Sequence, residues 1–201
     1  MKIKTLFLIG FVLLTACSNQ VKQAPLAADD VIVAFGDSLT VGYGTTNKFS
    51  YPAQLSKYIQ QTVINAGLSG EETTASLLRI DSVLKQYRPA LVLLCIGGND
   101  FLRKRSRKIT QLNIGLLIDK IHQSGSRVVL IAVPEWGLFL NPSVIYANVS
   151  ESHKVLLIED VLPELLSDSQ LKSDVIHLNT KGYGVFAERV FLELQEFGLV
   201  E

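Results

Sequence analysis

Short, continuous runs of apolar residues alternate with amphipathic segments along most of this chain, and this alternation constrains the fold more than any other feature. Four runs are clear, at residues 31–35, 63–66, 91–96 and 128–133, and a weaker fifth lies at 155–158. Runs of this length that are rich in β-branched residues are typical of strands buried on both faces. Strands that alternate with helices predict an α/β fold, with a five-stranded parallel sheet and helices on both of its faces.

The segments between the runs carry helical spacing. Apolar residues spaced by three or four positions predict one buried helix face in each of two segments. They are Leu77, Ile80, Leu84 and Tyr87 in the first segment and Leu112, Leu116, Leu117 and Ile121 in the second. Ser50 is a candidate N-cap ahead of an early proline, and Gly125 is a candidate helix stop. Asn179 precedes the pattern of a final helix.

Length and composition favour a single domain without a metal centre. The chain has 201 residues, a usual length for one domain. Its 19 Lys and Arg balance 19 Asp and Glu, and this neutrality argues against a dedicated nucleic-acid binder. Three widely separated histidines show no zinc-ligand spacing, and Cys95 lies in an apolar run where a buried, inert thiol is expected. We expect no cofactor, no metal, no nucleic-acid partner and a monomer.

The first residues form a separate unit. Lys2 and Lys4 precede an apolar run at residues 6–14, and Thr15-Ala16-Cys17 follows. A positive segment, an apolar stretch of about ten residues and small residues before a cleavage site are typical of a secretory signal. Residues 14–17 resemble the bacterial lipobox, in which the cysteine is acylated after cleavage. An ordinary signal peptide that ends near a cysteine is the alternative.

The lipobox resemblance sets the expected domain boundaries and location. It implies a lipoprotein signal peptide over residues 1–16, an acylated Cys17 that begins a tether over 17–30, and a folded domain over 31–201. Two or three acyl chains suffice for a stable membrane anchor. Ser18 follows the cysteine, which in Gram-negative lipoproteins favours the outer membrane. The resemblance therefore implies a lipid-anchored protein of the bacterial envelope that faces the periplasm.

Turns that contain glycine follow the first three predicted strands. They read Gly-Asp-Ser-Leu at residues 36–39, Gly-Leu-Ser-Gly at 67–70 and Gly-Gly-Asn-Asp at 97–100. The carboxyl ends of parallel strands share the edge of the sheet at which α/β proteins bind ligands, so Ser38, the Gly67 amide and the Asn99 side chain are expected to converge. A nucleophilic oxygen beside two hydrogen-bond donors suits acyl transfer. Taken singly, each turn is more typical of a structural role.

A serine nucleophile needs a base, and His177 is the candidate. Asp174 precedes it by three residues, a spacing that puts both side chains on one side of a helical turn. The carboxylate can then hold the imidazole Nδ1–H and leave Nε2 free to accept the serine proton. The same pair could instead cap the last helix. His122 and His153 lie among polar and charged residues, where solvated side chains are expected.

In their order and spacing these motifs resemble the four blocks of the SGNH hydrolases, also called GDSL esterases. The resemblance spans residues 31–195 and is closest to the branch of small bacterial arylesterases, acyl-CoA thioesterases and lysophospholipases. It implies a flavodoxin-like, doubly wound sheet. The sequence contains no Gly-x-Ser-x-Gly elbow, which argues against the ordinary α/β-hydrolase fold.

The resemblance also implies roles for individual residues. Ser38 would be the nucleophile, His177 the base and Asp174 the residue that orients the base. The oxyanion donors would be the amides of Ser38 and Gly67 and the side chain of Asn99. Leu178 stands where the family usually has proline, and this departure is expected to loosen the His177 loop.

Two segments near the predicted site allow two interpretations each. Residues 103–108 carry five positive charges, which fit a solvated loop or a surface that attracts anionic headgroups or a phosphate-bearing substrate. Residues 134–140 include Trp136 and Phe139, which could form a wall for an acyl chain or cover a neighbouring helix. Ser69 is expected to serve its own turn.

Three functions follow from the resemblance and the residues. The first is a serine esterase that cleaves small-molecule or lipid acyl esters or thioesters through an acyl-enzyme on Ser38. The second is an O-acetyl esterase or acyltransferase that acts on cell-envelope glycans. The third is a non-catalytic lipoprotein, which the complete set of Ser38, Asn99, Asp174 and His177 disfavours.

Overall fold

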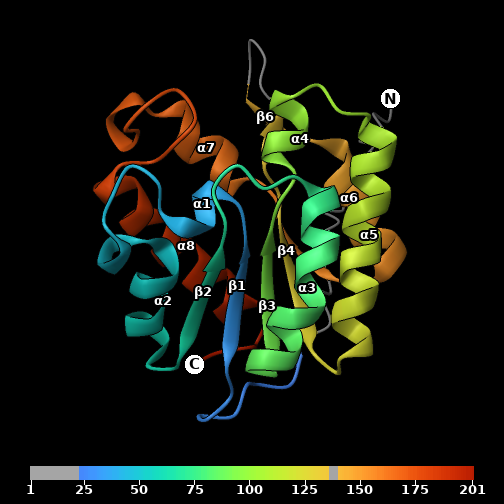
Figure 1. Ribbon diagram of the computed structural model, residues 1–201. Helices are drawn as coiled ribbons and strands as arrows, with labels where there is room; N and C mark the ends of the chain where they lie inside the picture. Colours follow the sequence, from blue (N-terminus) through green and yellow to red (C-terminus); the bar gives the residue numbers. More distant parts are fainter. Residues whose placement is uncertain (1–22, 136–139) are drawn as a thin grey trace, which may run out of the picture.

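The computed structural model describes residues 23–135 and 140–201, and a parallel sheet lies at its centre (Figure 1). The strand order is β2-β1-β3-β4-β7. These strands are β1 (Ile32–Gly36), β2 (Val63–Gly67), β3 (Leu91–Cys95), β4 (Arg127–Ile131) and β7 (Leu156–Ile158). All four pairings are parallel, which confirms the five predicted strands and the α/β class. A separate antiparallel pair joins β5 (Pro134–Glu135) to β6 (Asn141–Pro142).

Helices cover both faces of the sheet. In chain order they are α1 (Ser38–Val41), α2 (Tyr51–Ile59), α3 (Thr73–Tyr87), α4 (Gly98–Leu102), α5 (Arg107–Gln123), α6 (Val144–His153), α7 (Val161–Ser167) and α8 (Thr180–Glu196), with short 3-10 turns at Asn47–Phe49 and Ser169–Leu171. Helix α2 packs against α8, and α3 packs against α5. In Figure 1, α3 and α5 lie in front of the sheet and α8 passes behind it, as expected of a doubly wound fold.

The strand register aligns the ends of three neighbouring strands, β2, β1 and β3. Gly36 at the end of β1 is paired with Gly67 on β2 and with Cys95 on β3. The three segments that leave these strands therefore start at the same level of the catalytic edge, by which we mean the carboxyl edge of the sheet. All five residues of β1 and of β3 are buried, as the continuous apolar runs predict.

The predicted helix boundaries hold, but one predicted helix face is wrong in part. On α3, Ile80 and Leu84 are buried as expected. On α5, Leu117 and Ile121 are buried as expected, together with Ile114 and Ile118, whereas Leu112 and Leu116 are exposed by 56% and 42%. Apolar residues occupy two faces of α5, and spacing alone does not indicate which one meets the sheet.

The described N-terminal residues lie against the domain. The amide of Leu26 donates to the Leu199 carbonyl at 2.9 Å, and the amide of Gln23 donates to Phe197 at 3.0 Å. Part of the predicted tether is thus bound to the last turn of the chain. The signal peptide, Cys17, Trp136 and Phe139 lie outside the described residues. Within residues 23–135 and 140–201, none of the helices has the length and apolar character needed to cross a membrane.

Candidate active site

Ser38 is the first residue of helix α1 and is separated from the end of strand β1 by Asp37 alone. Asp37 caps this helix, because its Oδ1 accepts a hydrogen bond from the Leu39 amide at 3.0 Å. Gly36 allows the strand to enter the turn: a Cβ there would lie 2.0 Å from the Cys95 carbonyl oxygen, a distance that only glycine avoids. Strand β1 and the Asp37 cap together fix Ser38 at the catalytic edge.

The structure brings Ser38, His177 and Asp174 into one chain of hydrogen bonds. His177 Nε2 lies 3.0 Å from Ser38 Oγ, and His177 Nδ1 lies 2.8 Å from Asp174 Oδ2. The tautomer that suits both contacts donates from Nδ1–H to the carboxylate and accepts the serine proton at Nε2. This is the arrangement of a nucleophile, a base and a group that orients the base.

The Asp174–His177 pair is held by a turn and not by the predicted helical turn. Asp174 Oδ1 accepts hydrogen bonds from the amides of Ile176 at 2.8 Å and His177 at 2.9 Å. An aspartate that binds the amides two and three residues ahead forms a local turn of its own. Burial opposes ionisation of Asp174, but the hydrogen bonds from His177 and from the two amides outweigh it and lower the pKa of the carboxyl.

The loop after α1 contacts the His177 loop. The ring of Tyr43 lies 4.4 Å from the His177 ring, centroid to centroid, with 38° between their planes. At Gly44, whose φ is +93°, a Cβ would lie 2.2 Å from Ser173 Oγ. Leu178, which replaces the usual proline, is fully buried, and its carbonyl accepts a hydrogen bond from Ser173 Oγ at 3.1 Å.

Asn99 lies on the opposite side of Ser38 at the start of α4. Its Nδ2 donates to the Glu71 carbonyl at 3.1 Å and approaches Asp37 Oδ2 at 3.3 Å. These two acceptors determine which end of the amide is the nitrogen. The Asn99 NH₂ group therefore points toward Asp37 and the nucleophile turn, where an oxyanion donor is needed.

The amide of Gly67 is the oxyanion donor expected from the β2–α3 turn. Its N–H donates to Asn65 Oδ1 at 3.0 Å, so this amide already has an acceptor. The part of the β2–α3 turn that reaches Asn99 is Gly70–Glu71, since the Glu71 carbonyl accepts from Asn99. Gly70 has a φ of +77°, and among the described residues its amide has no acceptor. A Cβ at Gly70 would lie 3.7 Å from Arg103 Nη2, with no other atom of the described residues within 4 Å.

Asp37 is a buried acid beside the nucleophile. Its pKa is raised to about 7, mainly by burial and in smaller part by the nearby carboxyls of Glu71 and Asp100. Hydrogen bonds from the Leu39 amide and from Asn99 act in the opposite direction. The site therefore keeps a carboxyl that is easily protonated next to the position where negative charge would develop on a reacting ester.

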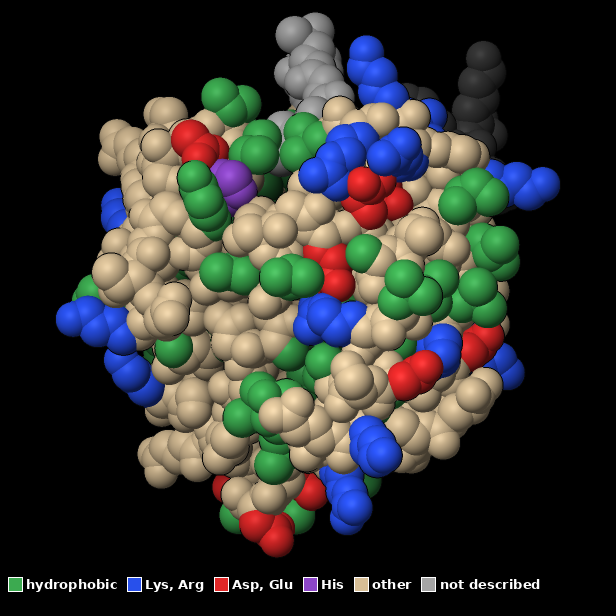
Figure 2. Space-filling model, in the orientation of Figure 1, with side chains coloured by type: hydrophobic (Ala, Val, Ile, Leu, Met, Phe, Trp, Pro, Cys, Tyr) green, Lys and Arg blue, Asp and Glu red, His purple; other side chains and the backbone are tan. Residues whose placement is uncertain are grey.

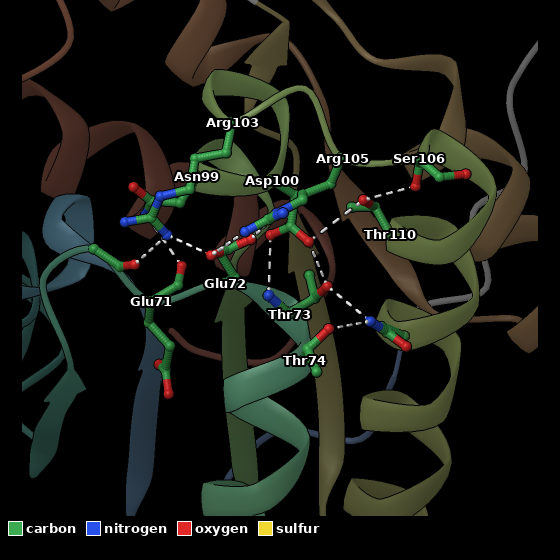
Figure 3. A network of polar contacts seen from close by, with 12 residues as sticks. Glu71, Glu72, Thr73, Thr74, Asn99, Asp100, Arg103, Arg105, Ser106 and Thr110 are labelled. Atoms are coloured by element: carbon green, nitrogen blue, oxygen red, sulfur yellow. Dashed lines mark hydrogen bonds and ion pairs between the residues drawn. The ribbon is translucent and has the colours of Figure 1, made fainter.

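A network of polar contacts supports Asn99 from below (Figure 3). Asp100 is buried and accepts hydrogen bonds from the Thr73 amide at 2.9 Å, from Thr73 Oγ1 at 2.6 Å and from Thr110 Oγ1 at 3.4 Å. Glu72 binds both Arg103 and Arg105 at 2.6 Å. Together these contacts join the start of α3 to α4 and the segment that follows it, and thereby set the position of Asn99.

A shallow depression lies over Ser38. It is lined by Asp37, Ser38, Leu39, Gly98, Asn99, Leu102, Val133, Ile176 and His177. Apolar side chains continue outside it, because Leu68 on the β2–α3 turn and Val175 beside Asp174 are exposed by 51% and 75%. The surroundings of the reactive groups are thus largely apolar, which suits an acyl group.

The remaining candidate residues lie apart from Ser38. Cys95 is fully buried, and burial raises the pKa of its thiol, as expected of an inert core cysteine. His122 is exposed as expected, whereas His153 is half-buried and contacts the Val149 carbonyl at 3.1 Å. Among the described residues, no group of three or more His, Cys, Asp and Glu side chains could hold a metal ion.

Three side chains of the site were not identified from the sequence. Asp37 and Asp100 belong to the quoted motifs, and an aspartate directly before a helix is a recognisable N-cap signal. Their burial, and the contact of Asp37 with Asn99, depend on the strand register. Tyr43 gave no signal, because its contact with His177 joins two loops that are far apart in the chain.

Comparisons with known proteins agree with this geometry. The profile of the GDSL-like Lipase/Acylhydrolase family matches residues 34–185. An arylesterase of Vibrio mimicus is 30% identical over 96% of this chain and 98% of its own length. The thioesterase 1/protease 1/lysophospholipase L1 of Escherichia coli K12 is 28% identical over 84% of this chain and 85% of its own.

Solved structures give the same result. The psychrotrophic esterase EstA from Pseudoalteromonas sp. superposes with a TM-score of 0.75 and 26% identity, covering 84% of this chain and 98% of that one. AlinE4, described as an SGNH-hydrolase family esterase, superposes with a TM-score of 0.65 and 26% identity over 85% and 97%.

The fold, the hydrogen-bonded serine and these relatives define a carboxylic ester hydrolase with an esterase or thioesterase activity. The chain belongs to the GDSL-like lipase/acylhydrolase family. Its structural relative AlinE4 is an SGNH-hydrolase family esterase.

Proposed function

We propose that the enzyme cleaves acyl esters or thioesters through a covalent acyl-enzyme on Ser38. The observation that carries the proposal is the 3.0 Å contact between Ser38 Oγ and His177 Nε2. In the first step Oγ attacks the acyl carbon while Nε2 takes the Oγ proton. Nε2 then gives this proton to the leaving alcohol or thiol. Asp174 stays ionised throughout and stabilises the imidazolium.

The second step hydrolyses the acyl-enzyme and regenerates the free Ser38 hydroxyl. A water molecule attacks the acyl carbon, its proton passes to Nε2, and the bond from the acyl carbon to Ser38 Oγ breaks as Oγ regains a proton. The products are a carboxylic acid and free enzyme. The Asp174 side chain is 44% exposed, so solvent lies close to the histidine that would activate this water.

We assign the oxyanion hole to the Ser38 amide, the Asn99 side chain and the Gly70 amide. Gly70 takes the place expected for Gly67, because the Gly67 amide donates to Asn65 and the Gly70 segment is the one that reaches Asn99. Donors fixed on the backbone and by a buried network are preorganised for the negative charge of the tetrahedral intermediate.

Detection of the acyl-enzyme tests the mechanism. We expect rapid quenching during turnover of a slowly released aryl ester, followed by digestion and mass spectrometry, to show one added acyl group on the peptide that contains Ser38. The Ser38→Ala variant should show none. An acyl group on any other residue, or burst kinetics that persist in Ser38→Ala, would contradict the assignment.

The length of the acyl group is a separate question, and the apolar edge around Ser38 supports a chain longer than acetyl. Each buried CH₂ contributes roughly 0.8 kcal/mol, so kcat/KM should rise with chain length along a series of aryl esters. Trp136→Ala or Phe139→Ala should flatten this rise and leave acetyl esters almost unchanged. A flat profile in the wild-type enzyme would favour the O-acetyl esterase or acyltransferase of envelope glycans.

We also propose that Cys17 anchors the protein to a bacterial membrane, facing the periplasm from the outer membrane. The support is the lipobox-like sequence at residues 14–17 behind a short apolar run. Metabolic labelling with a fatty-acid analogue tests the proposal: the wild-type chain should be labelled, and Cys17→Ser should not. A wild-type chain without label would exclude the anchor.

A further inference from the structure

Helix α5 carries a second apolar stripe that faces away from the sheet. Ile109, Leu112 and Leu116 are spaced as on one helix face, and their exposed fractions lie between 42% and 56%. Val144 on the neighbouring helix α6 is exposed by 65%. These four side chains line a groove between α5 and α6. Exposed apolar side chains that are contiguous in this way mark a surface that binds another protein or a membrane.

A basic segment lies directly beside this stripe. Residues 103–108 contain five Lys and Arg side chains, and the carboxylates paired with them are Glu72 and Glu135. Lys104 and Lys108 make no ion pair among the described residues. Figure 2 shows Lys and Arg side chains gathered at the upper edge of the molecule, where Figure 1 places α4 and the start of α5. The segment thus has an excess of positive charge.

These charges are not placed to stabilise the helix. Arg107 and Lys108 lie in the first turn of α5, and this turn contains no acidic residue. The helix dipole is positive at this end, so cations there are disfavoured. Both side chains also line the groove beside Ile109. The cations and the stripe are therefore parts of one surface, which we call the α5–α6 face.

We propose that the α5–α6 face docks on an anionic lipid bilayer. Apolar side chains of an interfacial helix enter the boundary between headgroups and acyl chains, and the cations beside them contact lipid phosphates. A second copy of the chain is disfavoured, because it would present the same excess of positive charge on its own α5–α6 face. Asp119, at the far end of the groove, is the acidic residue of the lining and faces His153 at 3.7 Å.

The N-terminal end of the described chain lies near the end of helix α6. Gln23 lines a depression there together with Ser150 and Lys154. Cys17 is six residues earlier, a reach of at most about 20 Å. An anchor on Cys17, as proposed above, would hold the protein close to the bilayer that this face contacts.

Docking in this orientation places the catalytic edge beside the membrane. Leu102, which lines the depression over Ser38, directly precedes the basic segment. Acyl substrates dissolved in the bilayer would then reach Ser38 without crossing bulk water. This consequence rests on the proposed esterase mechanism, whereas the docking itself does not.

Vesicle binding by the full chain tests the docking. We expect at least tenfold tighter binding to vesicles that contain phosphatidylglycerol than to phosphatidylcholine alone, and a loss of this preference at high salt. Lys104→Glu/Lys108→Glu should lower the ratio of the two binding affinities by about tenfold or more. The matched control, Lys57→Glu/Lys85→Glu, changes the net charge equally on exposed residues of α2 and α3 and should retain the preference.

A second pair of variants tests the apolar stripe. Leu112→Ser/Leu116→Ser should weaken binding to both vesicle types by about tenfold, while Leu78→Ser/Leu192→Ser, at exposed leucines of α3 and α8, should not. All variants keep the same N-terminus, so any anchor contributes equally to each. Hydrolysis of a soluble acetyl ester should stay unchanged in all of them, which separates this result from the test of the mechanism. Equal binding to both vesicle types, or equal losses in test and control variants, would overturn the proposal.

Discussion

The two sides of Ser38 are built in opposite ways. On one side, His177 and Asp174 lie on a loop, their contact is local in sequence, and the Asp174 side chain is 44% exposed. On the other side, Asn99 is held by Asp37 and Glu71, and Asp100 beneath it is buried and bound to Thr73. We call the first side accessible because Asp174 is open to solvent, although His177 itself is only 11% exposed, and we call the second side buried because of Asp100. The proposed mechanism assigns proton transfer to the accessible side and fixed hydrogen-bond donors to the buried side.

This difference corresponds to two tasks with different physical requirements. Proton transfer needs a side chain that changes its charge, and the Asp174 carboxylate beside His177 favours the charged imidazole. Stabilisation of an oxyanion needs donors that do not reorganise, and burial within a network keeps them fixed. The predictions below test this division, beginning with the largest expected effect.

Removal of the proton relay should have the largest effect. Ser38→Ala and His177→Ala should each lower kcat for an aryl ester by about 10⁴-fold or more, as residues that act as one unit do. Steady-state kinetics with far-ultraviolet circular dichroism measures the loss and checks that the fold is retained. Near wild-type turnover in either variant would show that the substituted residue does not take part in the reaction.

Removal of one oxyanion donor should have a smaller effect. Asn99→Ala should lower kcat on the order of 10²–10³-fold, or about 3–4 kcal/mol, because the donor acts mainly in the transition state. KM should change little. The same kinetics decide the point: a variant that raises KM and keeps kcat would make Asn99 a ground-state binding residue.

The buried acid should make stability depend on pH. The pKa of Asp37 is raised from 3.8 to about 7 in the folded chain, so the native state holds a proton that the unfolded chain has released. Stability is therefore lost as pH rises from about 4 to about 7, by roughly 3 kcal/mol between about pH 5 and pH 8. Asp37→Asn cannot ionise, and urea denaturation at the two pH values should show a smaller loss than in the wild type. Parallel losses in both proteins would assign the proton to another group.

Sequence patterns predicted most of this fold, and they named Ser38, Asp174 and His177, which the structure joins by hydrogen bonds. The apolar runs indicated the strands because strands buried on both faces need continuous apolar residues. Asp174 and His177 were predictable because their contact spans three residues. Two features could not be predicted from the sequence, because they depend on the folded chain. Gly67 donates to Asn65 only once the turn is folded, and the buried face of α5 depends on the sheet that the helix contacts.

The supporting network should separate stability from chemistry. Asp100→Ala leaves the amide and hydroxyl of Thr73 buried without this acceptor, which should cost about 2–3 kcal/mol of unfolding free energy. Asp174→Ala, the matched change on the accessible side, should cost under about 0.5 kcal/mol and still impair turnover. Urea denaturation of the two variants provides the comparison. Equal destabilisation would show that Asp100 and Asp174 contribute equally to the unfolding free energy.

Tyr43 should show the smallest effect, since it supports the accessible side by packing alone. Its ring lies 4.4 Å from the His177 ring, and its carbonyl accepts a hydrogen bond from Tyr183 Oη at 2.9 Å. An aromatic contact of this kind contributes about 0.5–1.5 kcal/mol, so Tyr43→Ala should lower kcat about three- to tenfold through a less fixed imidazole. Tyr43→Phe keeps the ring and should retain wild-type kinetics. If Tyr43→Phe lost as much activity as Tyr43→Ala, the phenol hydroxyl and not the ring would be the functional group, and the accessible side would contain a second polar participant.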